Sequence, residues 1–316
     1  MILKKQYCIL SFYLTRTLFL AGAFHLLCKI GKNDVILGST LGMLLGYFIL
    51  FLFYRHGNVS KSLKVCISIF IVLLSFLSST LLTNSFLLYT TPTLVLLIPL
   101  VLVMICSNRL EITGISRSTE VFHLFTFIII FVSWFGLLKI VRIGNILPIF
   151  QTKMIDMIKC IVIFASVSLL PNLLLLEYKK NYSFLEIGKG YILGCLSIIA
   201  ILFFILSIYG YEYASILRFP EYMILKRIHF MNYINNIENI LVMEWILNAI
   251  ITLMVCSYVL YTTLSKRIYY SVLVLLCFIT RFVFMKYYAN ILIIKYYFWY
   301  ICVLVLIISY IKKEKC

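Results

Sequence analysis

Charged residues are scarce in this sequence, and acidic ones are the rarest. Of its 316 residues, 12% are charged, only 11 are Asp or Glu, and 64% are hydrophobic, with a mean hydropathy of +1.08. A soluble domain keeps about a quarter of its residues charged, and it could not bury this much apolar surface in a core. The composition therefore excludes an ordinary water-soluble protein and indicates that lipid is part of the solvent.

Motifs for catalysis or metal binding are also missing. The ten cysteines are scattered, mostly within apolar runs, and none forms a Cys-x-x-Cys pair, which favours small buried side chains over a disulfide or metal framework. The sequence has no phosphate-binding Gly loop and no Ser-His-Asp or Cys-His arrangement in a plausible context. His25, His123 and His229 lack metal-ligand spacing. We therefore expect no enzyme activity, no metal and no cofactor.

A net charge of +17 would suggest nucleic acid as the partner of a soluble protein. Here Lys and Arg stand mostly in short loops, where positive charge orients transmembrane helices. The loops on the N-terminal side of the membrane carry the larger share of them, which favours both termini in the cytoplasm. The expected partner is the lipid bilayer, and nucleic acid is not expected.

Long apolar runs without alternation predict transmembrane helices, because backbone groups in hydrocarbon need internal hydrogen-bond partners. We expect an all-α polytopic membrane protein with about ten transmembrane helices in a single domain, residues 1–316. The connection 210–235 is long enough to hold a surface helix around Phe219–Phe230 and is expected to face outward. The first span has no clear cleavage site and is expected to be retained. The expected spans are 8–28, 34–54, 63–82, 92–107, 121–141, 157–176, 191–209, 236–262, 268–287 and 291–311.

Two spans contain residues that weaken a helix. The first holds Leu20-Ala21-Gly22-Ala23, and the sixth holds Ala165-Ser166-Val167-Ser168 followed by Pro171. Weak points in spans one and six are typical of transporters with inverted repeats, whose broken helices bind ligands near the midplane. The alternative is that Gly22 is a helix-packing residue and Pro171 a simple kink. The corresponding five-plus-five repeats would cover about 8–141 and 157–311.

Among the ionisable residues within the apolar spans, three are candidates for a function: Arg16 in the first, and Glu238 and Glu244 in the eighth. Each costs about 2.5–3.5 kcal/mol to insert, so a function is a reasonable hypothesis for all three. Glu244 could bind a proton or a ligand and could pair with Arg16. The alternative is a buried ion pair that only fixes two helices.

Four short stretches, spread over most of the chain, resemble those of the spore germination permease-like family (GerAB type). Thr-Pro opens span four, Arg-x-x-Glu precedes span five, Asn-x-x-Pro precedes span six, and a longer stretch leads into span eight. Their order against the ten-span plot is more specific than any one motif. The matching residues are Thr91-Pro92, Arg117-Ser118-Thr119-Glu120, Asn145-Ile146-Leu147-Pro148, and Phe219-Pro220, Arg227-Ile228, Ile237-Glu238 and Trp245.

Family members are B-type membrane subunits of nutrient germinant receptors and are related to amino acid/polyamine/organocation transporters. The resemblance implies a transporter-like five-plus-five fold in the spore inner membrane, with an A-type membrane subunit and a C-type lipoprotein subunit as partners. The sequence departs from the family pattern at Gln151-Thr152-Lys153, where a glycine is expected, and at Phe164-Ala165-Ser166-Val167, where members often carry an acid.

The expected function is that of a receptor subunit that binds a small nutrient, of amino acid class, between spans one, three, six and eight. A carboxylate would bind the amides freed at the span-one break, and serines on span three would add hydrogen bonds. Ligand binding would shift the population of bundle conformations and trigger germination. The candidate ligand residues are Ala21, Gly22, Ala23, Ser75, Ser78, Ser79, Phe164, Ser166 and Ser168, and those for coupling are Arg16, Glu238 and Glu244.

Three alternatives stay open. The chain could be a proton-coupled amino acid permease in which Glu244 or Glu238 carries the proton. It could be an assembly subunit that no longer binds nutrient, or it could form a path for water or ions.

Overall fold

The computed structural model describes residues 4–21, 23–56, 59–86, 91–176, 183–217, 219–227 and 237–284. These residues form helices and connecting segments, and no strand occurs among them. Six helical segments are long and apolar enough to cross a membrane. The chain is therefore an all-α polytopic integral membrane protein. The expected span 291–311, Gly22 and the side chain of Glu238 lie outside this description.

The helices match the expected spans from the first to the eighth, and the ninth corresponds to α11 and the turn that follows. The observed ends of these spans lie within about ten residues of the expected ends. The elements are α1 (Lys4–Thr17), η1 (Phe19–Ala21), α2 (Ala23–Gly31), η2 (Lys32–Asp34), α3 (Val35–His56), α4 (Lys61–Phe86), α5 (Thr93–Ser107), α6 (Glu111–Leu138), η3 (Ile143–Ile146), α7 (Met154–Asn172), α8 (Phe184–Ala214), α9 (Pro220–Leu225), α10 (Ile237–Thr263), α11 (Lys266–Ile279) and the π-helical η5 (Thr280–Phe284).

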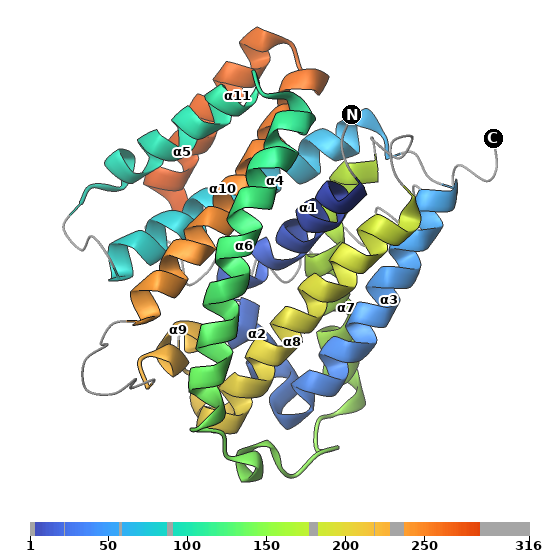
Figure 1. Cartoon of the computed structure of the whole chain (residues 1–316), viewed down its shortest axis with the longest axis vertical. Coiled ribbons are helices and arrows are strands. Elements are labelled where there is room, and N and C mark those ends of the chain that lie inside the picture. Colours follow the sequence, from blue (N-terminus) through green and yellow to red (C-terminus); the bar gives the residue numbers. More distant parts are fainter. Residues whose placement is uncertain are drawn as a thin grey trace.

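Helix α1 lies in the middle of the bundle, where it contacts α6, α7, α8 and α10 (Figure 1). Helices α3, α7 and α8 pack together on one side of it, and α4, α5 and α10 on the other. The most extensive contacts join α1 to α8 and α3 to α7. Helices α1, α3, α7 and α8 are spans one, two, six and seven. A five-plus-five repeat relates span one to span six and span two to span seven, so it would make the α1–α8 contact and the α3–α7 contact equivalent.

The outer surface of the bundle is apolar. On α6, for example, Val121, Leu124 and Phe131 are 73%, 69% and 63% exposed, whereas Thr126 and Ser133 on the same helix are buried. Such a surface would be unfavourable in water. On α6 the apolar side chains face outward and the polar ones inward, which is the reverse of a helix in a soluble protein. This arrangement is expected where lipid surrounds the outer face and polar groups pair inside.

The first span is interrupted where small residues predict a weak point. The α-helix of α1 ends at Thr17, Phe19–Ala21 form a 3-10 turn, and α2 begins at Ala23. The expected interruption of span one is thus present in the backbone.

In span six the change of helix type lies near the end of the helix. The α-helix of α7 runs through Ala165–Ser168, and the chain changes to a 3-10 helix at residue 173. Pro171 has no N–H group to donate to the carbonyl of Val167, but the helix stays α-helical there. The backbone around Ser166 and Ser168 therefore remains α-helical.

The connection after α8 contains the expected helix, but this helix is not on the surface. Helix α9 covers Pro220–Leu225, and Pro220, Glu221 and Tyr222 are buried against the neighbouring helices, α8 and α10 among them. Helix α8 extends beyond its expected end to Ala214, with a non-helical Gly210 at φ 69° inside it. This positive φ is open to glycine at little cost, so Gly210 allows the chain to turn toward α9.

The loop before α7 is held by the carboxylate of Asp34. Its Oδ1 accepts a hydrogen bond from the backbone N–H of Phe150 at 2.6 Å, and its Oδ2 accepts one from Thr152 at 2.9 Å. The Thr152 hydroxyl in turn donates to the carbonyl of Gly31 at 2.9 Å. The junction of α2 and α3 is therefore fixed to the start of span six.

Asp34→Ala is expected to lower the unfolding free energy by about 1.5–3 kcal/mol, because hydrogen bonds to a buried charged group are lost. Thermal unfolding of the purified protein in detergent would show this as a lower midpoint. The control is Asp156→Ala, which removes an exposed pair with Lys159 and should leave the midpoint unchanged. Equal midpoints for the two variants would contradict the role of Asp34.

Candidate ligand site beside the break in the first span

An ion pair buried between α1 and α10 is the centre of the site. The Nη1 of Arg16 lies 2.7 Å from Oε1 of Glu244, and the two side chains are 1% and 0% exposed. The guanidinium also lies over the ring of Phe12, 4.9 Å from its centroid. Burying each charge costs several kcal/mol, so the two side chains need each other. The pairing of Arg16 with Glu244 that the sequence predicts is confirmed.

A second layer of polar side chains lies beside this pair. The Thr17 hydroxyl oxygen is 2.9 Å from Oδ1 of Asn248 and 2.5 Å from the hydroxyl oxygen of Thr252. Glu244, Asn248 and Thr252 are four residues apart and therefore share one face of α10. Because Arg16 and Thr17 are the last residues of α1, this polar face of α10 lies beside the break in span one.

Several polar atoms of this cluster have no hydrogen-bond partner in the described part of the chain. They are the donors Nε of Arg16, Nε1 of Trp245 and Nδ2 of Asn248, and the acceptor Oε2 of Glu244. Leaving such an atom unpaired in the interior costs about 1–3 kcal/mol. Buried polar groups are normally paired, so a cluster of unpaired ones indicates a place where water or a ligand binds.

A small cavity borders the cluster. Its volume is about 20 Å³, which is room for one water molecule. Arg16, Ser133 and Trp245 are among the residues that line it, together with Glu221, which is only 1% exposed. The buried helix α9 therefore brings a second acidic residue to the cavity that Arg16 borders.

The candidate residues of span six meet the break through an aromatic contact. The rings of Phe164 and Phe19 lie 4.8 Å apart between centroids, and Phe19 begins the 3-10 turn that ends at Ala21. The hydroxyls of Ser166 and Ser168 donate to carbonyls one turn earlier in α7. Phe164 is thus brought to the break, while both serine hydroxyls are engaged with their own helix and that of Ser168 also lies 2.7 Å from the Tyr191 hydroxyl of α8.

The serines of span three lie on α4, which packs against η1 and α10. Ser75 and Ser79 are buried, and their hydroxyls have no partner in the described part of the chain. Ser78 is half-buried and donates to the carbonyl of Ser75 at 3.1 Å. None of the hydrogen bonds seen in the described segments joins these serines to Arg16 or Glu244.

A separate polar network, which the sequence reading missed, joins α1 to α7. The Ser11 hydroxyl donates to Oδ1 of Asn172 at 2.7 Å, and Nδ2 of Asn172 donates to the Thr15 hydroxyl at 2.8 Å. Polar residues four apart within an apolar span could have revealed it. The same spacing of four occurs in α10, where Glu244, Asn248 and Thr252 stand within an apolar span. No comparable sequence signal marks Glu221.

Of the stretches that carry the family resemblance, some lie at helix ends, whereas Arg117–Glu120 lies within α6 and Trp245 within α10. Pro92 precedes α5, and Asn145 donates from Nδ2 to the carbonyl of Ser207 in α8 at 2.9 Å. Glu120 in α6 pairs with Lys5 at 3.5 Å. Phe219 precedes the buried helix α9. These contacts fix helices to one another. Ile228 lies outside the described residues.

A comparison with known protein families finds no family model that matches the chain, and a comparison with curated proteins finds no match.

Proposed function

We propose that this chain is the membrane subunit of a spore nutrient germinant receptor and binds a small nutrient of the amino acid class. In this proposal it lies in the spore inner membrane and acts with an A-type subunit and a C-type lipoprotein. The observation that supports it most is the interruption of span one directly after Arg16 and Thr17. The interruption lies beside a buried polar face of α10. Interrupted helices beside buried polar groups are typical ligand sites of transporter-like bundles.

The unpaired atoms of the site complement an amino acid. A zwitterion offers a carboxylate, which accepts hydrogen bonds, and an ammonium group, which donates them. The donors Arg16 Nε, Trp245 Nε1 and Asn248 Nδ2 fit the carboxylate, and Oε2 of Glu244 fits the ammonium group. Charge-assisted hydrogen bonds of this kind are the strongest in proteins and would offset the cost of burying the ligand.

The size of the cavity indicates how binding would be transmitted. A space of about 20 Å³ holds one water molecule and no amino acid, so a ligand needs a more open arrangement of α1, α6, α9 and α10. A ligand that binds only the open arrangement raises the population of that arrangement. The partner subunits would sense this shift, and germination would follow.

Deleting the chain from spores is expected to remove the response to one nutrient and to spare the response to others. Dipicolinic acid release, followed across a panel of single amino acids, measures this.

Asn248→Leu should raise the nutrient concentration for half-maximal release at least about tenfold, since a lost hydrogen bond to a charged ligand is worth about 1.5–3 kcal/mol.

The matched control is Thr262→Val on the exposed side of the same helix, which should respond as the wild type does. An unchanged nutrient profile after deletion would contradict the receptor proposal. An unchanged Asn248→Leu response in a chain that otherwise acts as a receptor would place the ligand elsewhere.

The second candidate function is a proton-coupled amino acid permease. It is favoured by the two buried carboxylates near Arg16, Glu244 in the ion pair and Glu221 in the cavity lining. A proton on either would change the charge balance around Arg16. Purified protein in vesicles would then take up amino acid faster under an inward proton gradient, and Glu244→Gln would remove that dependence. Nutrient binding without uptake would favour the receptor instead.

A further inference from the structure

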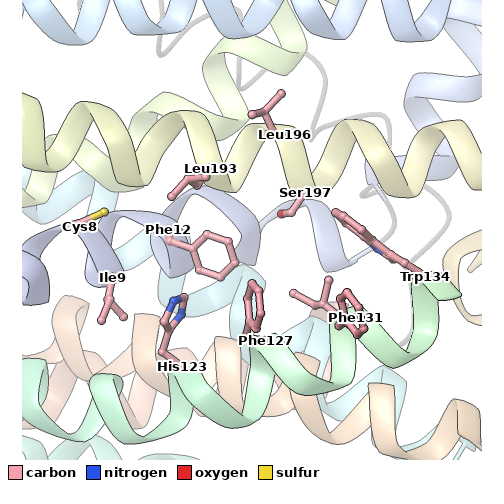
Figure 2. A pocket seen from close by; sticks show the side chains of 11 residues that line it. Cys8, Ile9, Phe12, His123, Phe127, Phe131, Trp134, Leu193, Leu196 and Ser197 are labelled. Carbon is pink, nitrogen blue, oxygen red and sulfur yellow. The ribbon is translucent and has the colours of Figure 1, made fainter.

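A groove of about 370 Å³ opens on the outer side of the bundle between α1, α6 and α8 (Figure 2). Its volume is in the range of small-molecule pockets. Phe12 comes from α1, Phe127 and Trp134 from α6, and Leu193 from α8. The Ser197 hydroxyl in its wall already donates to the carbonyl of Gly194 at 2.7 Å. The lining also includes His123, whose ring packs edge-on against Phe12 at 5.3 Å and whose Nδ1 has no hydrogen-bond partner in the described part of the chain. The other lining side chains are mostly apolar, so the groove as a whole is suited to hydrocarbon.

The groove is continuous with the lipid-facing surface. Phe127, Phe131 and Leu193 line it, and they are 61%, 63% and 53% exposed. Further along α6, Leu124 and Phe135 extend the same apolar surface. In a membrane the substance that meets this surface is the acyl chains of the bilayer. An acyl chain that moves from the bilayer into the groove leaves no water behind, so it gains only packing, and the shape of the groove decides whether it is occupied.

One end of the groove lies near two lysines. Cys8 lines this end, one turn after Lys5, whose side chain is 73% exposed. A Cβ added to Gly190 of α8 would overlap the carbonyl oxygen of Cys8, so the neighbouring Lys189 also lies near this end. Two carboxylates also lie near this end: Glu120 forms an exposed, screened pair with Lys5, and Glu186, which is close to Cys8 as Lys189 is, caps the start of α8 with Ser183. Lys4 is close to Glu186, so the bases at this end still outnumber the acids. The phosphate of a lipid whose chain fills the groove would find positive charge here.

The other end of the groove borders the candidate ligand site. Ile130 and Trp134 line both the groove and the small cavity beside Arg16. Phe12 lines the groove and also lies under the Arg16 guanidinium. An acyl chain in the groove would therefore contact Phe12, which lies under Arg16, and Ile130 and Trp134, which line the cavity beside Arg16.

We propose that this groove binds one acyl chain of a membrane phospholipid, with the phosphate beside Lys5 and Lys189 and the chain against Phe12 and Trp134. The proposal stands on the groove and its lysines and does not depend on the nutrient or on germination. It assigns to the bilayer a specific contact with the residues around Arg16.

Quenching of Trp134 fluorescence by brominated lipid tests the position of the chain. The full-length protein with Trp245→Phe and Trp299→Phe keeps Trp134 as its single tryptophan. It is placed in vesicles of phosphatidylcholine with rising fractions of chain-brominated phosphatidylcholine. Bromine quenches on contact, so Trp134 should be quenched, and the groove-filling variants Ser197→Phe and Cys8→Phe should each halve the quenching or more.

The reference is Leu185→Trp in a chain without other tryptophans, because Leu185 is 63% exposed on α8 and does not line the groove. Its quenching should not change with either filling variant. Two filling variants from different helices guard against one that fails to fold. The proposal is overturned if Trp134 is not quenched, or if a folded filling variant leaves its quenching unchanged.

The position of the phosphate is tested with brominated phosphatidylglycerol in the same vesicles. Lys189→Gln should lower the preference of the groove for this anionic lipid over phosphatidylcholine about fivefold. The control is Lys61→Gln, a substitution of an exposed lysine on α4, which should leave the preference unchanged. An equal preference in the two variants would show that Lys189 does not hold the phosphate.

Discussion

Arg16→Met is expected to lower the free energy of unfolding by about 3–5 kcal/mol, because it leaves Glu244 as an uncompensated buried charge. The Nη1 of Arg16 lies 2.7 Å from Oε1 of Glu244, and both side chains are almost fully buried. Methionine keeps much of the volume of the arginine stem, so the loss reports the charge more than a cavity. Thermal or denaturant unfolding in detergent, followed by intrinsic fluorescence, measures it.

The double variant Arg16→Met/Glu244→Leu should recover most of that stability, because replacing both partners of a buried pair by apolar residues is often neutral. The exposed control is Lys5→Met, which removes a surface pair with Glu120 and should leave the midpoint unchanged. Wild-type stability in Arg16→Met would show that the pair does not hold α1 to α10.

The double variant also separates the two interpretations of the pair. If Arg16 and Glu244 only fix two helices, the stable double variant should still respond to nutrient. If they bind the ligand as proposed, the double variant should be folded and unresponsive. Dipicolinic acid release from spores that carry the double variant therefore answers a question that unfolding data alone leave open.

Gly190→Ala is expected to lower the unfolding free energy by about 1–3 kcal/mol, and Gly190→Leu by more, because α1 and α8 touch at this glycine. An added Cβ would overlap the carbonyl oxygen of Cys8 and lie 2.8 Å from Cβ of Ser11. A backbone carbonyl within α1 cannot move aside as a flexible side-chain end can. The contact between α1 and α8 would have to open.

Gly144→Ala is the matched control, because a Cβ added at that glycine meets no atom within 4 Å. It should leave the unfolding midpoint close to that of the wild type. Gly194→Ala, one turn after Gly190, should also destabilise, since its Cβ would lie 2.8 Å from Cβ of Thr15. Equal midpoints for the Gly190 and Gly144 variants would contradict the tight packing of α1 on α8.

The sequence located the weak point of span one but could not settle that of span six. At Leu20–Ala23 small residues predicted an interruption, and the α-helix does stop at Thr17. Near Ala165–Ser168 the helix stays intact, and the change comes after Pro171. A proline removes one donor, but neighbouring groups decide whether the rest of the helix adjusts or unwinds.

The sequence also indicated the Arg16–Glu244 pair, whereas Glu221 could only be found in the structure. An ionisable residue within an apolar span needs a partner wherever it lies, so two of opposite charge are a natural pair. Glu221 stands in a polar connection, where the sequence predicts exposure. Its burial results from the packing of α9 among the neighbouring helices, which no local pattern encodes.

Membrane insertion and helical structure follow from the sequence by itself, because the transfer of a side chain into hydrocarbon and the need to pair each peptide group are properties of short segments. The lipid-facing groove and the polar cavity beside Arg16 were decided only by the tertiary structure. Their walls come from α1, α6, α8, α9 and α10, so their shape depends on how these helices rotate and cross. Those angles are set by contacts between residues far apart in the chain, such as Gly190 with Cys8, where backbone meets backbone.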